Sequence, residues 1–258
     1  MIHYLANTTA ISFADAVART IELRRKGRPE IEFPHSHPCD CLGESYEHML
    51  RLRGGSMGFY NDVILPRLCD LAMRNKDMLP YRERVIGGAE GRVLEIGIGS
   101  GLNLPFYRNI REIIGLEPAP GLIAMAHRAA KSISTPVFLI DGSAEAVPID
   151  DQSFDTVVTT WTLCTIPDAA RALTEMRRVL KPSGRLLFVE HGIALEASVR
   201  AWQNWLTPAW KRISGGCHLN RPIKPMIAGA GFTFERLETG YMPGLKPMGF
   251  LYQGSARP

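Results

Sequence analysis

The residues most suggestive of chemistry are three glycines at alternate positions, Gly97, Gly99 and Gly101, which follow the apolar run 93–96. Glycine has no Cβ, so a ligand can lie directly against the backbone of such a turn. We expect the turn to open a helix, whose first N–H groups and positive dipole end would favour an anionic group on that ligand. A glycine triplet alone is a weak signal, and its neighbours decide its meaning.

Three acidic residues stand close to these glycines in the expected sheet. Glu95 precedes Gly97 by two residues, Glu117 follows it by twenty, and Asp141 ends a third apolar run. Carboxylates suit an ammonium group, the two hydroxyls of a ribose and the exocyclic amine of adenine, in that order along the chain. Because open α/β sheets bind ligands at the carboxyl ends of their strands, we expect the acids and the glycines to share one ligand.

The glycine spacing argues against a nicotinamide dinucleotide. That fingerprint reads G-x-G-x-x-G, whereas the sixth position counted from Gly97 is Leu102. The chain also offers no evident arrangement for hydride transfer. A nicotinamide-dependent oxidoreductase is therefore the weaker hypothesis for this loop.

Short apolar runs alternate with helical stretches from residue 92 onward. Strands are expected over residues 92–96, 112–116, 137–140, 156–160, 185–190, 232–237 and 250–253, and helices over 58–75, 78–87, 119–131 and 169–180. This alternation predicts an α/β fold, a doubly wound and mostly parallel sheet with helices on both faces. Neither a repeat nor a low-complexity linker interrupts residues 57–258, which we expect to form one domain.

Residues 1–56 form a leader of different character. They hold four of the seven histidines, and their seven acidic and seven basic residues cancel. We expect no packed domain there. A second interpretation places the natural start at Met57, because Arg53-Gly54-Gly55 is what a purine-rich ribosome-binding site would encode. The pattern H-x-H-x-C-x-C over residues 35–41 lacks the C-x-x-C spacing of zinc sites, so we expect a flexible tail and no metal.

Composition limits the function classes. The net charge of +4 over 258 residues is too small and dispersed to indicate a nucleic-acid partner. Five cysteines without a framework spacing, and no recognisable signal peptide, favour a reducing, cytoplasmic location. No stretch approaches the roughly 18 to 20 apolar residues that cross a bilayer, so we expect no transmembrane segment.

Five motifs together resemble the class I S-adenosylmethionine-dependent methyltransferases over roughly residues 92–190: VLEIGIGSG, LEP, DGSAEAVP, SFDTVVTTWTL and LKPSGRLLFVEH. The resemblance implies a seven-stranded, Rossmann-like sheet whose last strand is antiparallel, and S-adenosylmethionine as cofactor. It implies that Gly97, Gly99, Gly101, Glu117 and Asp141 hold this cofactor, that Ser143 and Ala144 lie beside its adenine, and that Thr160 lies near it.

The segment after residue 190 narrows the resemblance. EHG, a tryptophan-rich stretch and GGCHLNR are similar to a methyltransferase-like group that includes animal small-thiol S-methyltransferases, and bacterial relatives of that group typically begin near a sequence like Met57-Gly58-Phe59-Tyr60. The similarity implies methyl transfer to a small, apolar acceptor, with a thiol favoured. A lipid or quinone acceptor at a membrane surface, reached by peripheral contact, is the alternative. A cofactor-binding module without catalytic activity is another.

An acceptor must lose its proton before it attacks the methyl carbon, and histidine is the commonest base. His191, which follows the fifth expected strand, is our candidate base, and a histidine that bonds only to backbone is the alternative. Trp202, Trp205 and Trp210 could roof an apolar pocket, anchor the domain at a lipid interface or pack on the sheet. Pro208 is expected to divide their segment into two pieces. We interpret Cys164 and Cys217 as structural thiols.

Overall fold

The computed structural model describes Tyr60 and residues 64–258. Its strands are β1 (Arg92–Ile96), β2 (Glu112–Glu117), β3 (Val137–Asp141), β4 (Phe154–Thr160), β5 (Leu180–His191), β6 (Thr233–Tyr241) and β7 (Phe250–Arg257). Its helices are α4 (Leu65–Met73), α5 (Leu79–Ile86), α6 (Pro120–Ala130), α7 (Ala169–Val179), α8 (Ala197–Ile213), α9 (Ile223–Gly229) and α10 (Lys246–Gly249), with the 3-10 turns η2 (Lys76–Met78) and η3 (Leu104–Phe106). The expected leader, residues 1–56, and the alternative start at Met57 lie outside the described residues.

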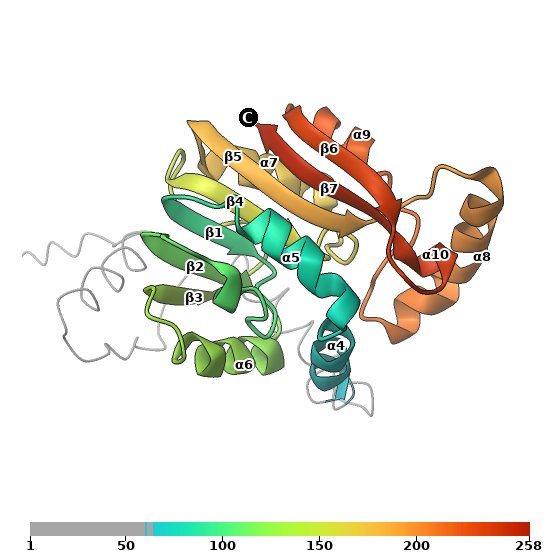
Figure 1. The fold of residues 1–258 in the computed structure, drawn as a ribbon, viewed down its shortest axis with the longest axis horizontal. Helices are drawn as coiled ribbons and strands as arrows, with labels where there is room; N and C mark the ends of the chain where they lie inside the picture. Colours follow the sequence, from blue (N-terminus) through green and yellow to red (C-terminus); the bar gives the residue numbers. More distant parts are fainter. Residues whose placement is uncertain (1–59, 61–63) are drawn as a thin grey trace, which may run out of the picture.

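The seven strands form one sheet in the order β3-β2-β1-β4-β5-β7-β6 (Figure 1). Strands β1 to β5 pair in parallel, and β7 runs antiparallel to both of its neighbours, β5 and β6. This confirms the expected α/β fold with a mostly parallel sheet. The chain returns at residue 250 to fill the gap between β5 and β6, so the run expected at 232–237 forms the outer edge.

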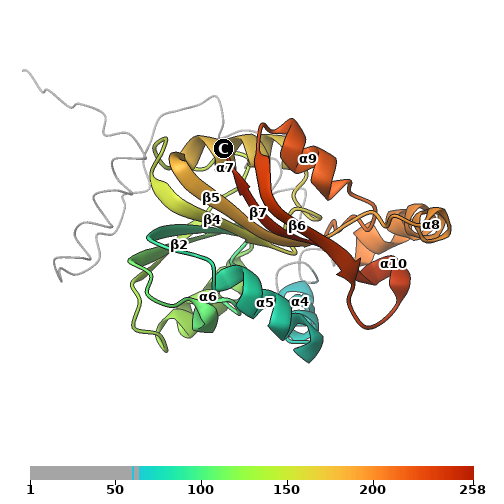
Figure 2. The same cartoon turned by 45° about the horizontal axis from the view of Figure 1, so that its top comes forward.

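Helices cover both faces of the sheet, as Figure 2 shows: α4, α5 and α6 lie on one side and α7 and α9 on the other. Strands between two helical layers need apolar residues on both faces, and every residue of β2 is buried. Helix α7 presents a buried stripe toward its side of the sheet, formed by Ala172, Leu173, Met176 and Val179. The core therefore consists of two apolar layers, one on each face of the sheet.

Two local expectations are wrong. The glycine turn does not open an α-helix: residues after Gly101 form turns and the short η3, and the chain is extended again at Tyr107. A helix dipole therefore contributes nothing at this turn. Pro208 does not divide its segment either, because α8 runs through it as one helix of 17 residues. The carbonyl of Asn204 that loses its partner to Pro208 belongs to an exposed residue, where water can replace the missing N–H.

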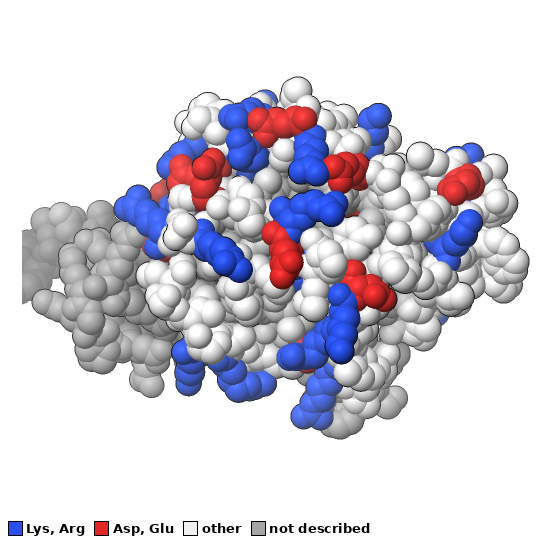
Figure 3. Space-filling view, viewed as in Figure 1, with Lys and Arg blue, Asp and Glu red and all other residues white. Residues whose placement is uncertain are grey.

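The surface carries charges of both signs. On the face shown in Figure 3, Lys and Arg side chains are interspersed with Asp and Glu rather than gathered into a stripe. Several of these charges are paired across elements, as in Arg185 with Glu235 (2.9 Å) and Arg84 with Glu238 (3.3 Å). This face therefore lacks the continuous positive field that would attract a nucleic acid.

Candidate functional site

The three glycines of the loop after β1 have left-handed backbones, with φ of 66°, 58° and 84° for Gly97, Gly99 and Gly101. A Cβ on Gly97 would collide with the side chain of Thr162 at 2.4 Å, and one on Gly101 would press on Ala129 at 3.0 Å. A Cβ on Gly99 would meet nothing nearer than 3.9 Å. The loop is thus packed at its two ends and open at its middle, which is the form of a cradle for a ligand.

Glu117 at the end of β2 closes one side of this cradle. Its two carboxylate oxygens accept hydrogen bonds from the backbone N–H groups of Gly99 and Ala119, both at 3.0 Å. Asp141 ends the neighbouring β3 and is the register partner of Glu117. Burial raises the pKa of Glu117, the two backbone bonds oppose this, and the charge of Asp141 raises it further. The structure therefore brings two predicted binding acids together beside the open glycine.

Glu95 lies beneath the loop instead of lining it. The side chain is fully buried, and its oxygens accept hydrogen bonds from Asn103 Nδ2 (2.7 Å) and Tyr107 Oη (2.8 Å). Asn103 also donates to Thr160 Oγ1 (2.9 Å) and accepts from Arg82. Burial raises the pKa of Glu95 to about 7, although these bonds and the charge of Arg82 lower it. Glu95 thus ties the loop to β4, and its direct contact with a ligand stays a prediction.

Asp70 on α4 is a candidate binding residue that sequence reasoning missed. Its Oδ2 accepts from Arg74 Nε (2.8 Å), whereas its Oδ1 is buried without a hydrogen-bond partner among the described residues. Burial raises the pKa of Asp70, but the hydrogen bond from Arg74 and the nearby Ser100 hydroxyl outweigh burial and lower the pKa, so the carboxylate stays charged. A buried, unpaired carboxylate oxygen is costly unless a ligand supplies a donor. Its interaction with Ser100 places it beside the glycine loop, where an ammonium group would satisfy it.

The residues after β3 lie at the same carboxyl edge of the sheet as Glu117 and Asp141. Ser143 Oγ donates to Glu145 Oε2 (2.9 Å) within its own turn, and Ala144 is buried in the core. Glu145 in turn accepts from the backbone N–H of Asp168 (2.6 Å) and so joins this turn to the start of α7. The turn is fixed, but the places of Ser143 and Ala144 beside an adenine stay predictions.

The turn after β4 is held by a buried carboxylate of β5. Glu190 accepts from Thr159 Oγ1 (2.7 Å) and from the backbone N–H groups of Thr162 and Leu163, both at 3.1 Å. Burial raises the pKa of Glu190 to about 7, against the effect of these three bonds. Within the turn Trp161 has a left-handed φ of 50°, a strained conformation for a bulky residue. The network holds this strained turn at the cradle, because Thr162 packs on Gly97.

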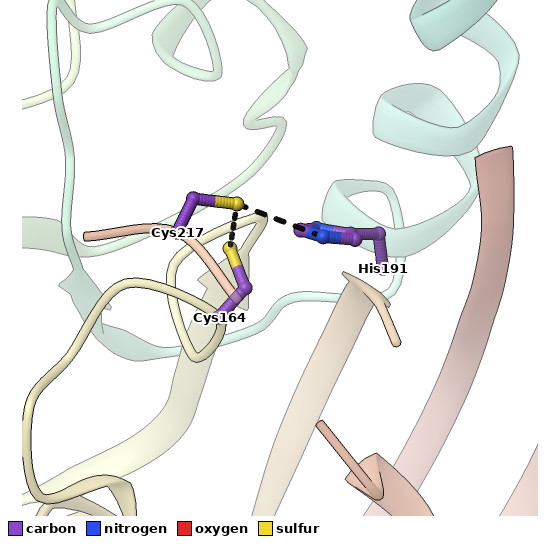
Figure 4. Close-up of side chains that lie close together, drawn as sticks. All are labelled: Cys164, His191 and Cys217. Atoms are coloured by element: carbon purple, nitrogen blue, oxygen red, sulfur yellow. Dashed lines mark hydrogen bonds between the residues drawn. The ribbon is translucent and has the colours of Figure 1, made fainter. Parts of the chain in front are cut away.

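His191 ends β5 beside two thiols, as Figure 4 shows. Its Nε2 lies 3.6 Å from Cys217 Sγ, and Cys217 Sγ lies 3.6 Å from Cys164 Sγ. Burial lowers the pKa of His191, but the hydrogen bond with Cys217 and the charge of Glu190 outweigh it and raise the pKa overall. The bond to Cys164 and burial raise the pKa of Cys217 far above its ordinary range. His191 is therefore not a histidine that bonds only to backbone.

The thiols and the glycine cradle belong to one region. Cys69 on α4 has a raised pKa, through burial first and then through the charges of both Cys217 and Glu117. The loop that carries Cys217 also packs on α4, because a Cβ on Gly215 would meet Leu65 at 3.0 Å. Helix α4 thus spans from the predicted ribose acid to the thiol group. Sequence reasoning predicted a helix over residues 58–75 but gave it no part in the site, because it precedes the recognisable motifs.

Comparisons with known proteins agree with this arrangement. A family model described as "Methyltransferase domain" matches residues 94–188, which include the glycine loop, both acids and most of β5. Thiol S-methyltransferase TMT1B of Rattus norvegicus is 33% identical over 153 residues, which are 58% of this chain and 63% of that protein. Phosphatidylethanolamine N-methyltransferase of Cereibacter sphaeroides is 29% identical over 164 residues, or 57% of this chain and 80% of that protein.

Solved structures share the fold. The S-adenosylmethionine-dependent methyltransferase from Mesorhizobium loti superposes with a TM-score of 0.55 at 15% identity, over 72% of this chain and 100% of that one. At this identity the likeness concerns the fold alone. The chain spans just under two thirds of the length of the rat thiol methyltransferase.

Proposed function

Because the chain belongs to the class I S-adenosylmethionine-dependent methyltransferases, we propose that it transfers a methyl group from S-adenosylmethionine to a small apolar acceptor, and that this acceptor is a thiol. The observation that carries the proposal is the open left-handed Gly99 beside the paired acids Glu117 and Asp141. These residues follow three neighbouring strands at the carboxyl edge of the sheet. That edge is where open α/β sheets bind nucleotides.

The residues present fit this cofactor. We assign its ribose hydroxyls to Glu117, its adenine to Asp141, Ser143 and Ala144, and its amino-acid part to the loop of Gly97, Gly99 and Gly101. The unpaired Oδ1 of Asp70 supports this assignment, because the ammonium group would give that buried oxygen its missing donor. We assign Glu95 and Thr160 to the same site through Asn103, which bonds to both of them.

The bound cofactor supplies a methyl group already activated by the positive charge of its sulfonium. The protein has to align acceptor and methyl carbon, exclude water and remove the proton of the acceptor. We assign the last task to His191, because it ends β5 at the same edge and its ring faces the Cys217 thiol. A thiol acceptor is supported by the activity for which the rat relative is named and by the thiol-rich lining around His191.

The proposed function predicts methylated thiol products. We expect mass spectrometry of a mixed panel of alkyl thiols, phenols, amines and phospholipids to show thioether formation at least tenfold faster than any other product. The reason is that a thiol ionises more readily than an alcohol and that its thiolate is a strong nucleophile. Calorimetric titration with S-adenosylmethionine gives the matched control. Cofactor binding without turnover on any acceptor would favour a cofactor-binding module and contradict the proposed activity.

One observation favours the second candidate, a lipid or quinone methyltransferase at a membrane surface. Trp202 and Trp205 are 57% and 71% exposed on α8, in a T-shaped pair with ring centroids 5.5 Å apart. Lys211 and Arg212 follow in the last turn of the same helix. Exposed tryptophans with nearby cations are typical of interfacial helices. Among the described residues, none of the helices is long and apolar enough to cross a bilayer.

The second candidate predicts vesicle binding through these tryptophans. If this candidate function holds, replacing both Trp202 and Trp205 with serine should weaken binding to anionic phospholipid vesicles at least tenfold in a co-sedimentation assay. The reason is that the membrane would lose two indole rings that insert into it. Leu71→Ser is the control, since this residue of α4 is similarly exposed, at 70%. Two results would contradict a membrane acceptor: equal sedimentation of the unaltered protein, the double tryptophan variant and Leu71→Ser, or no sedimentation of any of them with vesicles.

A further inference from the structure

Three metal-ligand atoms meet at the carboxyl edge of the sheet, close to the proposed cofactor site. Cys164 Sγ, His191 Nε2 and Cys217 Sγ all lie within 4.8 Å of one another. Figure 4 shows the two thiols and the imidazole turned toward a common centre. We propose that Cys164, His191 and Cys217 bind a zinc ion whose fourth position receives the sulfur of the acceptor.

The distances suit a tetrahedral zinc site. Zinc binds cysteine sulfur at about 2.3 Å and histidine nitrogen at about 2.0 Å, so ligand atoms around it lie about 3.8 Å apart for two sulfurs and about 3.5 Å for sulfur and nitrogen. In the structure both the Cys164–Cys217 and the Cys217–His191 separations are 3.6 Å. The third separation is at most 4.8 Å. A small rotation of one side chain brings all three to bonding distance.

The three segments hold their ligands in place without the ion. Glu190 fixes the turn that leads to Cys164 through the N–H groups of Thr162 and Leu163. His218 fixes the other cysteine, because its backbone N–H donates to the Cys164 carbonyl (2.9 Å) one residue after Cys217. His191 lies at the end of β5, within the sheet. Such preorganisation lowers the cost of binding a metal.

Within the part of the chain that the structure describes, three ligands meet, and this number indicates a reactive site rather than a structural one. Structural zinc sites have four protein ligands, whereas catalytic sites have three and keep one position open. Cys164 and His191 are buried, and Cys217 is only half-buried, so access is from the side of Cys217. Helix α4 links that side to Glu117 through Cys69. The thiol group and the proposed cofactor site are therefore neighbours on this side.

This inference deepens the proposed function and rests on it for the identity of the acceptor. A thiol that binds zinc releases its proton to solvent and stays as a thiolate, because the ion stabilises the anion. The thiolate sulfur then forms a bond to the methyl carbon, and the bond from carbon to the sulfonium sulfur breaks with its electron pair left on that sulfur. The neutral thioether is a weaker ligand and dissociates. In this scheme His191 acts as a zinc ligand, which replaces its proposed role as base.

The proposal runs against our expectation of no metal. The ligands stand far apart in the chain, with His191 and Cys217 separated by 26 residues and the two cysteines by 53. Zinc motifs are recognised by close pairs of ligands, and this group contains none. Only the fold brings the three residues together.

Metal analysis of the untagged, full-length protein tests the site directly. We expect about one zinc per chain by mass spectrometry of the metal content, in protein made with zinc and purified under reducing conditions without chelator. Cys164→Ser, Cys217→Ser and His191→Ala should each weaken zinc binding at least 100-fold, as measured by competition with a chromogenic chelator. Cys69→Ser is the matched control, because it removes a neighbouring thiol outside the group, and it should keep its zinc.

Exchange of zinc for cobalt tests the metal site separately from the proposed methyltransferase activity. Anaerobic exchange of zinc for Co²⁺ should give sulfur-to-cobalt charge-transfer absorption, and adding an alkyl thiol should increase it if the acceptor takes the fourth position. A metal-free protein that methylates thiols at full rate, or a disulfide between Cys164 and Cys217 in the reduced preparation, would overturn the zinc site and leave the methyltransferase proposal standing. Stoichiometric zinc binding without thiol methylation would instead contradict the assignment of a thiol as the acceptor.

Discussion

Replacing Gly99 with leucine should weaken binding of S-adenosylmethionine at least 100-fold and leave the protein folded. The Cβ at this position points into open space, with nothing nearer than the Gly97 carbonyl oxygen at 3.9 Å. A side chain added here would therefore extend into the cradle in which we place the cofactor. Its left-handed φ of 58° costs about 1 to 2 kcal/mol for a residue with a Cβ, which a domain of this size tolerates. Isothermal titration and thermal unfolding measure the two effects.

Gly244→Leu is the control for the strain alone. Gly244 also has a positive φ, 129°, and no atom lies within 4 Å of its added Cβ, but it belongs to the loop between β6 and α10. We expect this variant to bind the cofactor with the Kd of the unaltered protein. If Gly99→Leu bound equally well, the cofactor would have to lie elsewhere, and the assignment of the glycine loop would be lost.

Replacing His191 with alanine should slow methyl transfer by roughly 100-fold to 10,000-fold, the range in which positioned bases act. The Kd for the cofactor should stay within about threefold, because the interactions of Glu117 and Asp70 with the glycine loop do not involve the imidazole. Single-turnover kinetics with an alkyl thiol separates the two quantities. The expectation holds whether His191 accepts the proton or binds a metal, since either loss leaves the acceptor protonated.

His127→Ala provides the comparison, because it removes an exposed histidine of α6 that none of our proposals uses. It should leave both kcat and Kd unchanged. Unaltered turnover in His191→Ala would contradict every role proposed here for this residue. Restored turnover at high pH in that variant would identify proton removal as the lost step, because an acceptor that is already ionised needs no base.

Most of the sheet could be predicted because parallel strands have a simple pattern. Strand β2 is apolar along nearly its whole length, since both of its faces pack against helices. The order of the last two strands was harder. Their pairing depends on β7 entering between β5 and β6, and long-range pairing leaves little trace in local sequence. The prediction for Pro208 was wrong for a different reason. An exposed helix turn can lack one backbone hydrogen bond, because water satisfies the free carbonyl.

The same reason decides which residues of the site could be predicted. Gly97, Glu117 and Asp141 lie directly after or at the ends of strands, so their common edge followed once the strands were placed. Glu95 could be located but its surroundings could not: its partners, Asn103 and Tyr107, come from the turns that replace the expected helix. The thiol group was beyond sequence reasoning, since its two cysteines come from separate loops.

The place of β7 has a consequence for how the chain is made. Leu251 pairs with His191, and Leu251 also pairs with Gly240 of β6, so residues 250–257 join two strands that are otherwise apart in the sheet. On the ribosome, every earlier residue emerges before this connection can form. Until then β5 presents an open edge to the crowded interior of the cell, an arrangement that invites pairing with other nascent chains. The acceptor side of the protein is thus completed only after β7 has been made, and its yield should depend on chaperones that shield newly made strands.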